Sequence, residues 1–238
     1  MSIYREEIHL RSQDVDMHRR LRTSELFRLL QAAAVRHTEE LGGGRKVTLD
    51  KGLAWVVTHQ FVMVDRMPEF DERIAVRSWP GETIHLIFPR YYELVTENGE
   101  VLVRGSALWS LMDLKARTVA FPDEHGIEIP GMVTGREIPY LVKLEKLDMP
   151  NRCAFSVPYS YVDLYGHMNN TRYFDLAEDL IDAAKNGEIL REARIEYSAE
   201  AKLGDTVNVT WGEKDGMYYV NGTCERTCFR MNLRYAAP

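Results

Sequence analysis

Residues 163–184 read DLYGHMNNTRYFDLAEDLIDAA and join a polar loop to an amphipathic helix pattern. The apolar residues of this pattern recur at intervals of three and four: Tyr173, Leu176, Ala177, Leu180, Ile181 and Ala184. This spacing predicts a helix with one buried stripe, which Asn186-Gly187 ends. Just before it, a carboxylate, an imidazole and two carboxamides fall within the eight positions 163–170. Such groups at a helix N-terminus suit a general base beside an oxyanion site, although an Asn there often only caps the helix.

The rest of the chain shows the same plan twice. Residues 23–41 also form a helix pattern, which Gly42-Gly43-Gly44 ends. Runs typical of strands follow at 53–64, 73–79, 84–95 and 101–113, and Asn98-Gly99 is a hairpin signal between the last two. After the second helix, strands are expected at 193–199, 206–211, 217–224 and 228–235. A helix followed by antiparallel strands, twice over, predicts an α+β fold.

The two halves also align in detail, which favours a duplication over a chance match. Asp14 and His18 precede the first helix as Asp163 and His167 precede the second, at an offset of 149 positions. Residues 70–76 resemble residues 203–209 at an offset of 133. We place the difference of 16 residues in the glycine-rich loop around residues 42–52. The segment from Pro122 to Pro150 contains four prolines and is expected to connect the halves.

Composition narrows the function classes. The chain has 238 residues, 45% of them hydrophobic, and a net charge of −6, which argues against nucleic acid as a partner. No apolar run approaches 18 residues and the N-terminus has no signal sequence, so we expect a soluble, cytoplasmic protein that does not cross a membrane. Cys153, Cys224 and Cys228 lack the spacing of a metal site, and we expect no metal.

Three stretches resemble the acyl-acyl-carrier-protein (acyl-ACP) thioesterase family. Residues 29–37 and 52–68 resemble its first central helix and first core strand. Residues 163–173 are similar to its signature Asp-x-Asn-x-His-x-Asn-Asn-x-(Lys/Arg)-Tyr. The resemblance covers nearly the whole chain and implies a tandem double hotdog fold, in which an antiparallel sheet wraps a long central helix in each half. It also implies hydrolysis of fatty acyl-ACP to fatty acid and ACP without a cofactor.

The resemblance implies a division of labour between two domains. An N-terminal hotdog, residues 1–135, would be a degenerate copy that supplies walls of the acyl pocket. A C-terminal hotdog, residues 136–238, would carry the catalytic residues. In the first half Asp14 and His18 remain, but Arg20 and Leu21 stand where the Asn pair is expected.

Carried over residue by residue, the family pattern assigns the site. Asp163 and His167 take the catalytic Asp and His positions, and Asn169 and Asn170 match the Asn pair. Glu200 matches the carboxylate of a Glu-Cys pair, whose cysteine is Ala201 in this chain, so a thiol nucleophile is excluded at that position.

Like Ala201, Tyr165 departs from the family pattern, because it stands where the family has its catalytic Asn. A phenol donates a hydrogen bond but does not reproduce the paired donor and acceptor of a carboxamide. Either Tyr165 orients water or substrate differently, or activity and specificity have changed.

A mechanism follows from these assignments. Asp163 either activates water or attacks the thioester to form an anhydride, and the sequence leaves both open. Backbone N–H groups near Asn169 and Asn170 would polarise the carbonyl. His167 and Glu200 would position water and carry its proton. The acyl channel is expected to be lined by apolar residues of the first half: Leu26, Leu30, Val57 and Phe61.

The acidic carrier protein calls for basic docking residues. Arg226, Arg230 and Arg234 share one face of the last predicted strand and are candidates, although a charged sheet face is often only solvated. A homodimer is left open. Two other functions compete with acyl-ACP hydrolysis: an acyl-CoA thioesterase of the same fold, and a catalytically silent module that binds acyl groups or the carrier. Tyr165 is the best support for the silent module.

Overall fold

The computed structural model describes residues 3–140 and 143–237. The helices are α1 (Thr23–Glu40), α2 (Arg45–Asp50) and α3 (Arg172–Leu180), with short 3-10 turns η1 (Ser12–Asp14), η2 (Pro122–His125) and η3 (Tyr159–Tyr161). The strands are β1 (Tyr4–His9), β2 (Leu53–Val64), β3 (Arg73–Pro80), β4 (Phe88–Thr96), β5 (Val101–Asp113), β6 (Thr118–Val119), β7 (Asn151–Ser156), β8 (Ile189–Tyr197), β9 (Thr206–Lys214), β10 (Met217–Thr223) and β11 (Thr227–Ala236).

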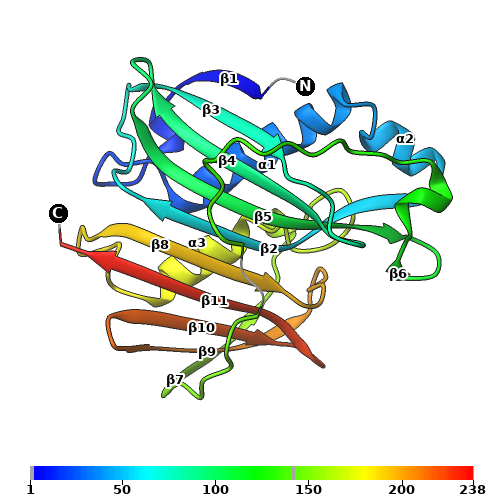
Figure 1. The fold of residues 1–238 in the computed structure, drawn as a ribbon. Coiled ribbons are helices and arrows are strands. Elements are labelled where there is room, and N and C mark those ends of the chain that lie inside the picture. The colour runs from blue at the N-terminus through cyan, green and yellow to red at the C-terminus, as the bar shows by residue number, and fades with distance from the viewer. Residues whose placement is uncertain (1–2, 141–142, 238) are drawn as a thin grey trace.

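The strands of the two halves form one continuous antiparallel sheet. Its order is β1-β3-β4-β5-β2-β8-β11-β10-β9-β7, with β6 paired to β5. The halves join where β2 pairs with β8, from His59 opposite Glu196 to Met63 opposite Glu192. Helices α1 and α3 lie side by side behind this sheet in Figure 1. This arrangement confirms the predicted α+β double hotdog fold.

The two central helices pack through their aromatic side chains. The rings of Phe27 and Phe174 are fully buried and stack with their centroids 3.8 Å apart. One turn away, the Thr23 hydroxyl donates a hydrogen bond of 2.5 Å to Glu178. The contacts 23–178 and 27–174 show that α1 and α3 run antiparallel. The start of α1 therefore lies beside the end of α3, and the start of α3 lies beside the first half of α1.

Helix α3 is shorter than its apolar pattern predicts, so the expectation of a long helix in both halves is wrong for the second half. The helix ends at Leu180, and Ile181 has extended backbone angles, φ −105° and ψ 149°. Ile181 and Ala183 are nevertheless buried. Their burial comes from a turn rather than from a further helical turn, which explains why the apolar spacing extends beyond the helix.

Most strands form where the alternation of residues predicts them. Strands β2 and β5 have the predicted bounds, Leu53–Val64 and Val101–Asp113. The sequence reading missed the edge strands β1 and β7. Each is an outer strand of six residues with one neighbour, and none of these residues is fully buried. Edge strands need fewer buried residues, which removes the signal that marks inner strands.

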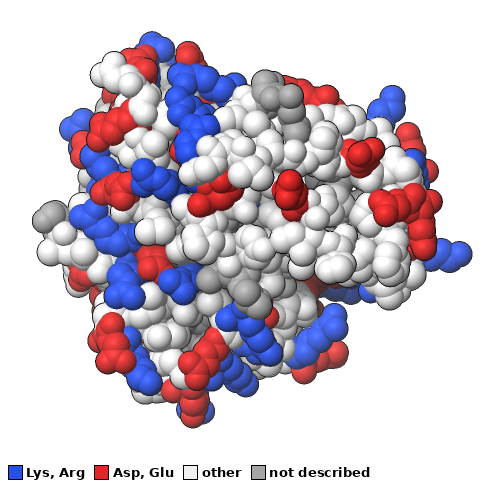
Figure 2. All heavy atoms as spheres, in the orientation of Figure 1, with Lys and Arg blue, Asp and Glu red and all other residues white. Residues whose placement is uncertain are grey.

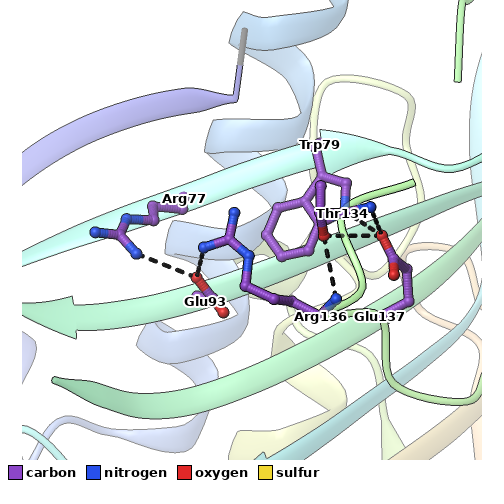
Figure 3. Close-up of polar contacts among 6 residues, drawn as sticks. All are labelled: Arg77, Trp79, Glu93, Thr134, Arg136 and Glu137. Atoms are coloured by element: carbon purple, nitrogen blue, oxygen red, sulfur yellow. Dashed lines mark hydrogen bonds and ion pairs between the residues drawn. The ribbon is translucent and has the colours of Figure 1, made fainter. Parts of the chain in front are cut away.

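Residues 126–140, which follow η2, cross the outer face of the first-half sheet (Figure 1). Figure 3 shows how side chains attach this segment: Arg136 and Arg77 both donate to the buried Glu93, at 3.2 and 3.3 Å. Glu137 accepts hydrogen bonds from the Thr134 backbone N–H at 2.6 Å and from the Trp79 indole at 3.2 Å. Desolvation opposes ionisation of Glu137, but these hydrogen bonds outweigh it and lower the pKa of Glu137 to about 2. The predicted domain division at 135/136 falls within this segment and stays a prediction.

Candidate active site

The loop before α3 presents Asp163 through a tight turn. The Asp163 backbone N–H donates to the His167 carbonyl at 2.9 Å, and the Tyr165 N–H donates to the Asp163 carboxylate at 2.9 Å. Gly166 has a φ of +82°, a conformation that side chains disfavour, so the turn needs glycine here. The turn fixes the backbone of Asp163, while its carboxylate accepts one backbone hydrogen bond.

His167 and Glu200 lie together although 33 positions separate them. The Met168 N–H donates to the Ala201 carbonyl at 2.7 Å, which sets the register between the two segments. As a result His167 Nε2 lies 3.0 Å from Glu200 Oε2. Arg117 also pairs with this carboxylate. The sequence reading missed Arg117, which lies in a turn far from either motif and carries no local signal.

Asn169 and Asn170 have different surroundings. The Asn169 side-chain oxygen accepts from the Thr171 N–H at 3.0 Å and from its hydroxyl at 2.8 Å, as a helix cap does. The N–H groups of Asn169 and Arg172 are also used, toward Tyr161 and Asn169. Among the described residues, the backbone N–H of Asn170 has no partner. Most of the expected backbone donors are therefore occupied, and Asn170 keeps one free.

A cavity of about 210 Å³ opens beside this loop. Asp163, Leu164, Tyr165 and Asn169 of the second half line it, and its other lining residues come from the first half. These wall residues include Gln31, Ala34, Val35, Thr38, Trp55, Phe88, Pro89 and Trp109. Tyr165 is 42% exposed, and the Arg45 guanidinium of α2 lies 5.6 Å from its ring centroid. The loop of one half and a mostly apolar wall of the other thus form one site.

One wall of the cavity contains a buried guanidinium. Arg90 donates to His37 Nδ1 at 3.1 Å, to the Ser78 hydroxyl at 3.0 Å and to the Thr38 hydroxyl at 2.9 Å. Burial lowers the pKa of Arg90 to about 10, so it remains charged at neutral pH. Burial and the charge of Arg90 lower the pKa of His37 to about 4. His37 is therefore a neutral acceptor in the core and not a base.

The predicted channel residues lie elsewhere in the first half. Leu26, Leu30, Val57 and Phe61 are all buried in the core, and none is among the residues that line the cavity. The face of α1 that lines it carries Gln31, Ala34, Val35 and Thr38 instead. The contact of the four predicted residues with substrate stays a prediction.

The counterpart of Asp163 in the first half is Asp16, not Asp14 as the sequence alignment had it. The Asp16 N–H donates to the Arg20 carbonyl at 2.8 Å, as the Asp163 N–H does to the His167 carbonyl. Isolated bridges pair Val15 with Leu21 and Val162 with Met168 in the same way. Arg20 therefore occupies the position of His167. The offset is 147, from Asp16 to Asp163.

This register corrects the other first-half equivalences. Arg22 and Thr23, rather than Arg20 and Leu21, take the places of the Asn pair. The strands keep the predicted offset of 133, since Leu21 bonds Pro68 as Met168 bonds Ala201. The extra length of the first half is thus 14 residues. It lies in the longer α1 and in α2, because α1 has 18 residues and α3 has nine.

A second, larger cavity of about 760 Å³ lies at this first-half loop. Its walls carry charged side chains from both halves, among them Asp16, Arg20, Arg172 and Glu178, which suits an alkyl chain poorly. Glu178 accepts from Thr23 and, at 3.0 Å, from the Tyr235 hydroxyl. Burial raises the pKa of Glu178 to about 7.

Glu178→Gln should stabilise the protein at high pH only. The folded pKa near 7 lies above the usual 4.5, so protonated Glu178 favours folding below pH 4.5 and this contribution disappears as the pH rises through 7. The amide keeps an acceptor for Thr23 and Tyr235 but carries no charge. We expect thermal melts to show a higher Tm for the variant than for wild type at pH 8, and the same Tm for both proteins at pH 4. An equal shift at both values would contradict the role assigned to this carboxyl.

The predicted docking arginines differ in availability. Arg226 is exposed but precedes β11, so it is not on the strand as expected. Arg230 is largely buried and pairs with Glu196 at 3.2 Å, and Arg234 lies 3.9 Å from Glu192. Figure 2 shows Lys and Arg interspersed with Asp and Glu over the region of β8 and β11. The charges of Arg230 and Arg234 are thus partly compensated within the sheet.

Two features are absent from the described residues. No group of three or more His, Cys, Asp or Glu side chains in residues 3–140 and 143–237 is arranged to hold a metal ion. Within the same ranges, no helix is both long and apolar enough to cross a bilayer.

Comparison with known proteins matches both halves of the chain to one family. The model of the acyl-ACP thioesterase N-terminal domain matches residues 1–125, and that of the C-terminal domain matches residues 144–228. The palmitoyl-acyl carrier protein thioesterase of Arabidopsis thaliana is 25% identical over 221 residues, which cover 83% of this chain and 52% of that protein. The dodecanoyl-ACP hydrolase of Cinnamomum camphora is 24% identical over 245 residues, covering 94% and 63%. The chain spans about half the length of the first curated relatives it matches.

Solved structures support the same fold. An acyl-ACP thioesterase from Bacteroides thetaiotaomicron superposes with a TM-score of 0.85 at 21% identity, covering 98% of both chains. The 12:0-ACP thioesterase from Umbellularia californica gives a TM-score of 0.84 at 20% identity, covering 99% of this chain and 98% of that one. At sequence identities of 20 and 21%, the structural similarity to these two proteins shows that the chain shares their fold. With family models matching both halves, this chain belongs to the acyl-ACP thioesterase family.

Proposed function

We propose that the chain hydrolyses the thioester of fatty acyl-ACP to free fatty acid and ACP. The observation that carries this proposal is the cavity itself. Asp163, Tyr165 and Asn169 line its rim, while its walls are mostly apolar side chains from α1, β4 and β5. An acyl thioester needs this combination, with polar groups at the reacting carbonyl and a dry channel for the alkyl chain.

Asp163 is the proposed reacting carboxylate. It lies on a rigid turn at the cavity and has one backbone hydrogen bond, from Tyr165, so its carboxylate has acceptor capacity left. It either takes a proton from the attacking water or attacks the thioester itself, and the geometry is compatible with both routes.

The thioester oxygen needs donors as it becomes negative. Because the side-chain oxygen of Asn169 is held by Thr171, its NH₂ group remains to donate into the cavity. The backbone N–H of Asn170 is the second candidate donor at the same helix start. These two donors replace the larger set of backbone groups that the sequence suggested.

His167 and Glu200 form the proposed proton relay. Their 3.0 Å contact holds the imidazole, and Arg117 pairs with the same carboxylate oxygen of Glu200. In the direct route, water oxygen bonds to the acyl carbon, its proton passes to a carboxylate, and the C–S bond breaks. The proton then reaches the carrier thiolate through this relay. Glu200 thus orients the His167 ring.

One observation favours a second function, a silent binding module. Tyr165 stands at the cavity rim and stacks under Arg45, where the family has an Asn. The aromatic ring is one of the cavity's lining groups from the second half. If it also prevents water from reaching the carbonyl, the protein would bind an acyl group without turnover.

The test is a measurement of thiol release from matched acyl-ACP and acyl-CoA panels of C4 to C18 chains. Hydrolysis selective for ACP is the expected result. Hydrolysis of CoA esters alone would mean that the carrier of the acyl group is CoA rather than ACP. A folded protein that releases no thiol from either panel would overturn the hydrolase proposal and favour the binding module.

An acidic carrier needs an exposed basic contact on this protein. Arg226 is the exposed member of the predicted set, since Arg230 is paired with Glu196. We propose Arg226, in the turn before β11, as the contact for acidic side chains of the carrier. Loss of charge there should raise KM for acyl-ACP and leave kcat unchanged.

A further inference from the structure

Gln31 has an unusual environment on the apolar face of α1. Its side-chain oxygen is buried and has no hydrogen-bond partner among the described residues. A buried acceptor without a partner destabilises a protein, so an unexplained one often marks a functional position. Gln31 also lines the cavity that contains Asp163 and Asn169. A ligand or water in this cavity is the partner that the protein itself does not supply.

The antiparallel helices place Gln31 at the reacting end of the cavity. Along α1, positions 23 and 27 lie beside positions 178 and 174 of α3. One further turn brings position 31 level with position 170, at the start of α3. Gln31 therefore lies near Asn169 and Asn170. Thr38, which bonds Arg90, is seven residues further along α1, or about 10 Å.

We propose that Gln31 is a catalytic residue that holds the attacking water in direct hydrolysis, an inference that rests on the proposed function. A water molecule has two O–H groups, and a single acceptor leaves it free to rotate. Asp163 accepts one proton and Gln31 Oε1 accepts the hydrogen bond from the other. A lone pair of the water then points at the acyl carbon. The water oxygen bonds to that carbon, one proton goes to Asp163, and the C–S bond breaks to release the carrier thiolate, which then takes up that proton to become the thiol.

The test compares Gln31→Met with wild type in kcat, KM and Tm. Methionine has a similar length but no acceptor, so we expect kcat to fall about 10- to 100-fold with KM unchanged. The Tm should stay equal or rise, because a buried acceptor without a partner is removed. Gln31→Glu keeps an acceptor and should retain more of kcat than Gln31→Met.

Gln13→Met is the matched control, because Gln13 lines the counterpart cavity of the first half. It should have wild-type turnover. A Gln31→Met variant with wild-type kcat would overturn the proposal. A fall in kcat accompanied by a lower Tm and a higher KM would assign Gln31 a structural role, and would overturn it too. Wild-type protein that hydrolyses no acyl thioester would instead show that the proposed function fails.

Discussion

Asp163→Asn should lower kcat for acyl-ACP by about 100- to 10,000-fold, the usual contribution of a general base or nucleophile. The amide retains an oxygen for the Tyr165 N–H, so the turn from Asp163 to His167 should form as in wild type. Only the ability to accept a proton or attack the thioester is lost. Steady-state kinetics on one acyl-ACP would measure this, with a circular dichroism spectrum to show that the fold is kept.

Asp16→Asn supplies the control, because Asp16 is the structural counterpart of Asp163 in the first half. Its carboxylate accepts the N–H groups of His18 and Arg20 at 2.8 and 2.9 Å, and the amide oxygen preserves this role as well. We expect turnover close to wild type. Equal losses in the two variants would mean that the chemistry is not confined to the second half.

Phe174→Ala should cost about 3–5 kcal/mol of folding stability, the range for removing a buried aromatic side chain. Phe174 is fully buried against Phe27, and this stack joins the central helices of the two halves. Its loss leaves a cavity between α1 and α3 that the surrounding sheet is too rigid to fill. Urea denaturation would show the change as a lower midpoint.

Two further variants check this interpretation. Phe27→Ala should destabilise by a similar amount, and the double variant by less than the sum, since both changes remove the same contact. Phe121→Ala serves as the control, because Phe121 is exposed and its loss should change stability by about 0.5 kcal/mol or less. A Phe174→Ala midpoint equal to that of Phe121→Ala would contradict the packing described here.

The sequence predicted the fold well where burial imposes a strict pattern. Strand β2 is covered on both faces for much of its length, and its predicted bounds are the observed ones. The pattern failed for α3, where Ile181 is buried from a turn rather than from a helix. Burial alone does not specify the backbone conformation, so the apolar spacing predicted a helix that is longer than the observed α3.

The site was harder to predict because its two sides come from different halves. The motif around Asp163 located the loop, and the strand register brings His167 to Glu200. Which face of α1 meets that loop depends on the crossing of the helices, so the predicted Leu26 and Leu30 are core residues while Gln31 lines the cavity. The Asp14 alignment failed for a related reason. The backbone hydrogen bonds that identify Asp16 as the counterpart leave no mark in the sequence.

The central claim is that the acyl chain occupies the first-half cavity while the second-half loop performs the chemistry. The most direct measurement is the chain-length profile of acyl-ACP hydrolysis for Val35→Trp, because Val35 lines the cavity and its partial exposure tolerates a larger side chain. The exposed Lys46→Trp on α2 is the control. We predict that Val35→Trp shifts the preference to shorter chains and that Lys46→Trp keeps the wild-type profile. An unchanged profile for Val35→Trp would contradict the placement of the acyl chain in this cavity.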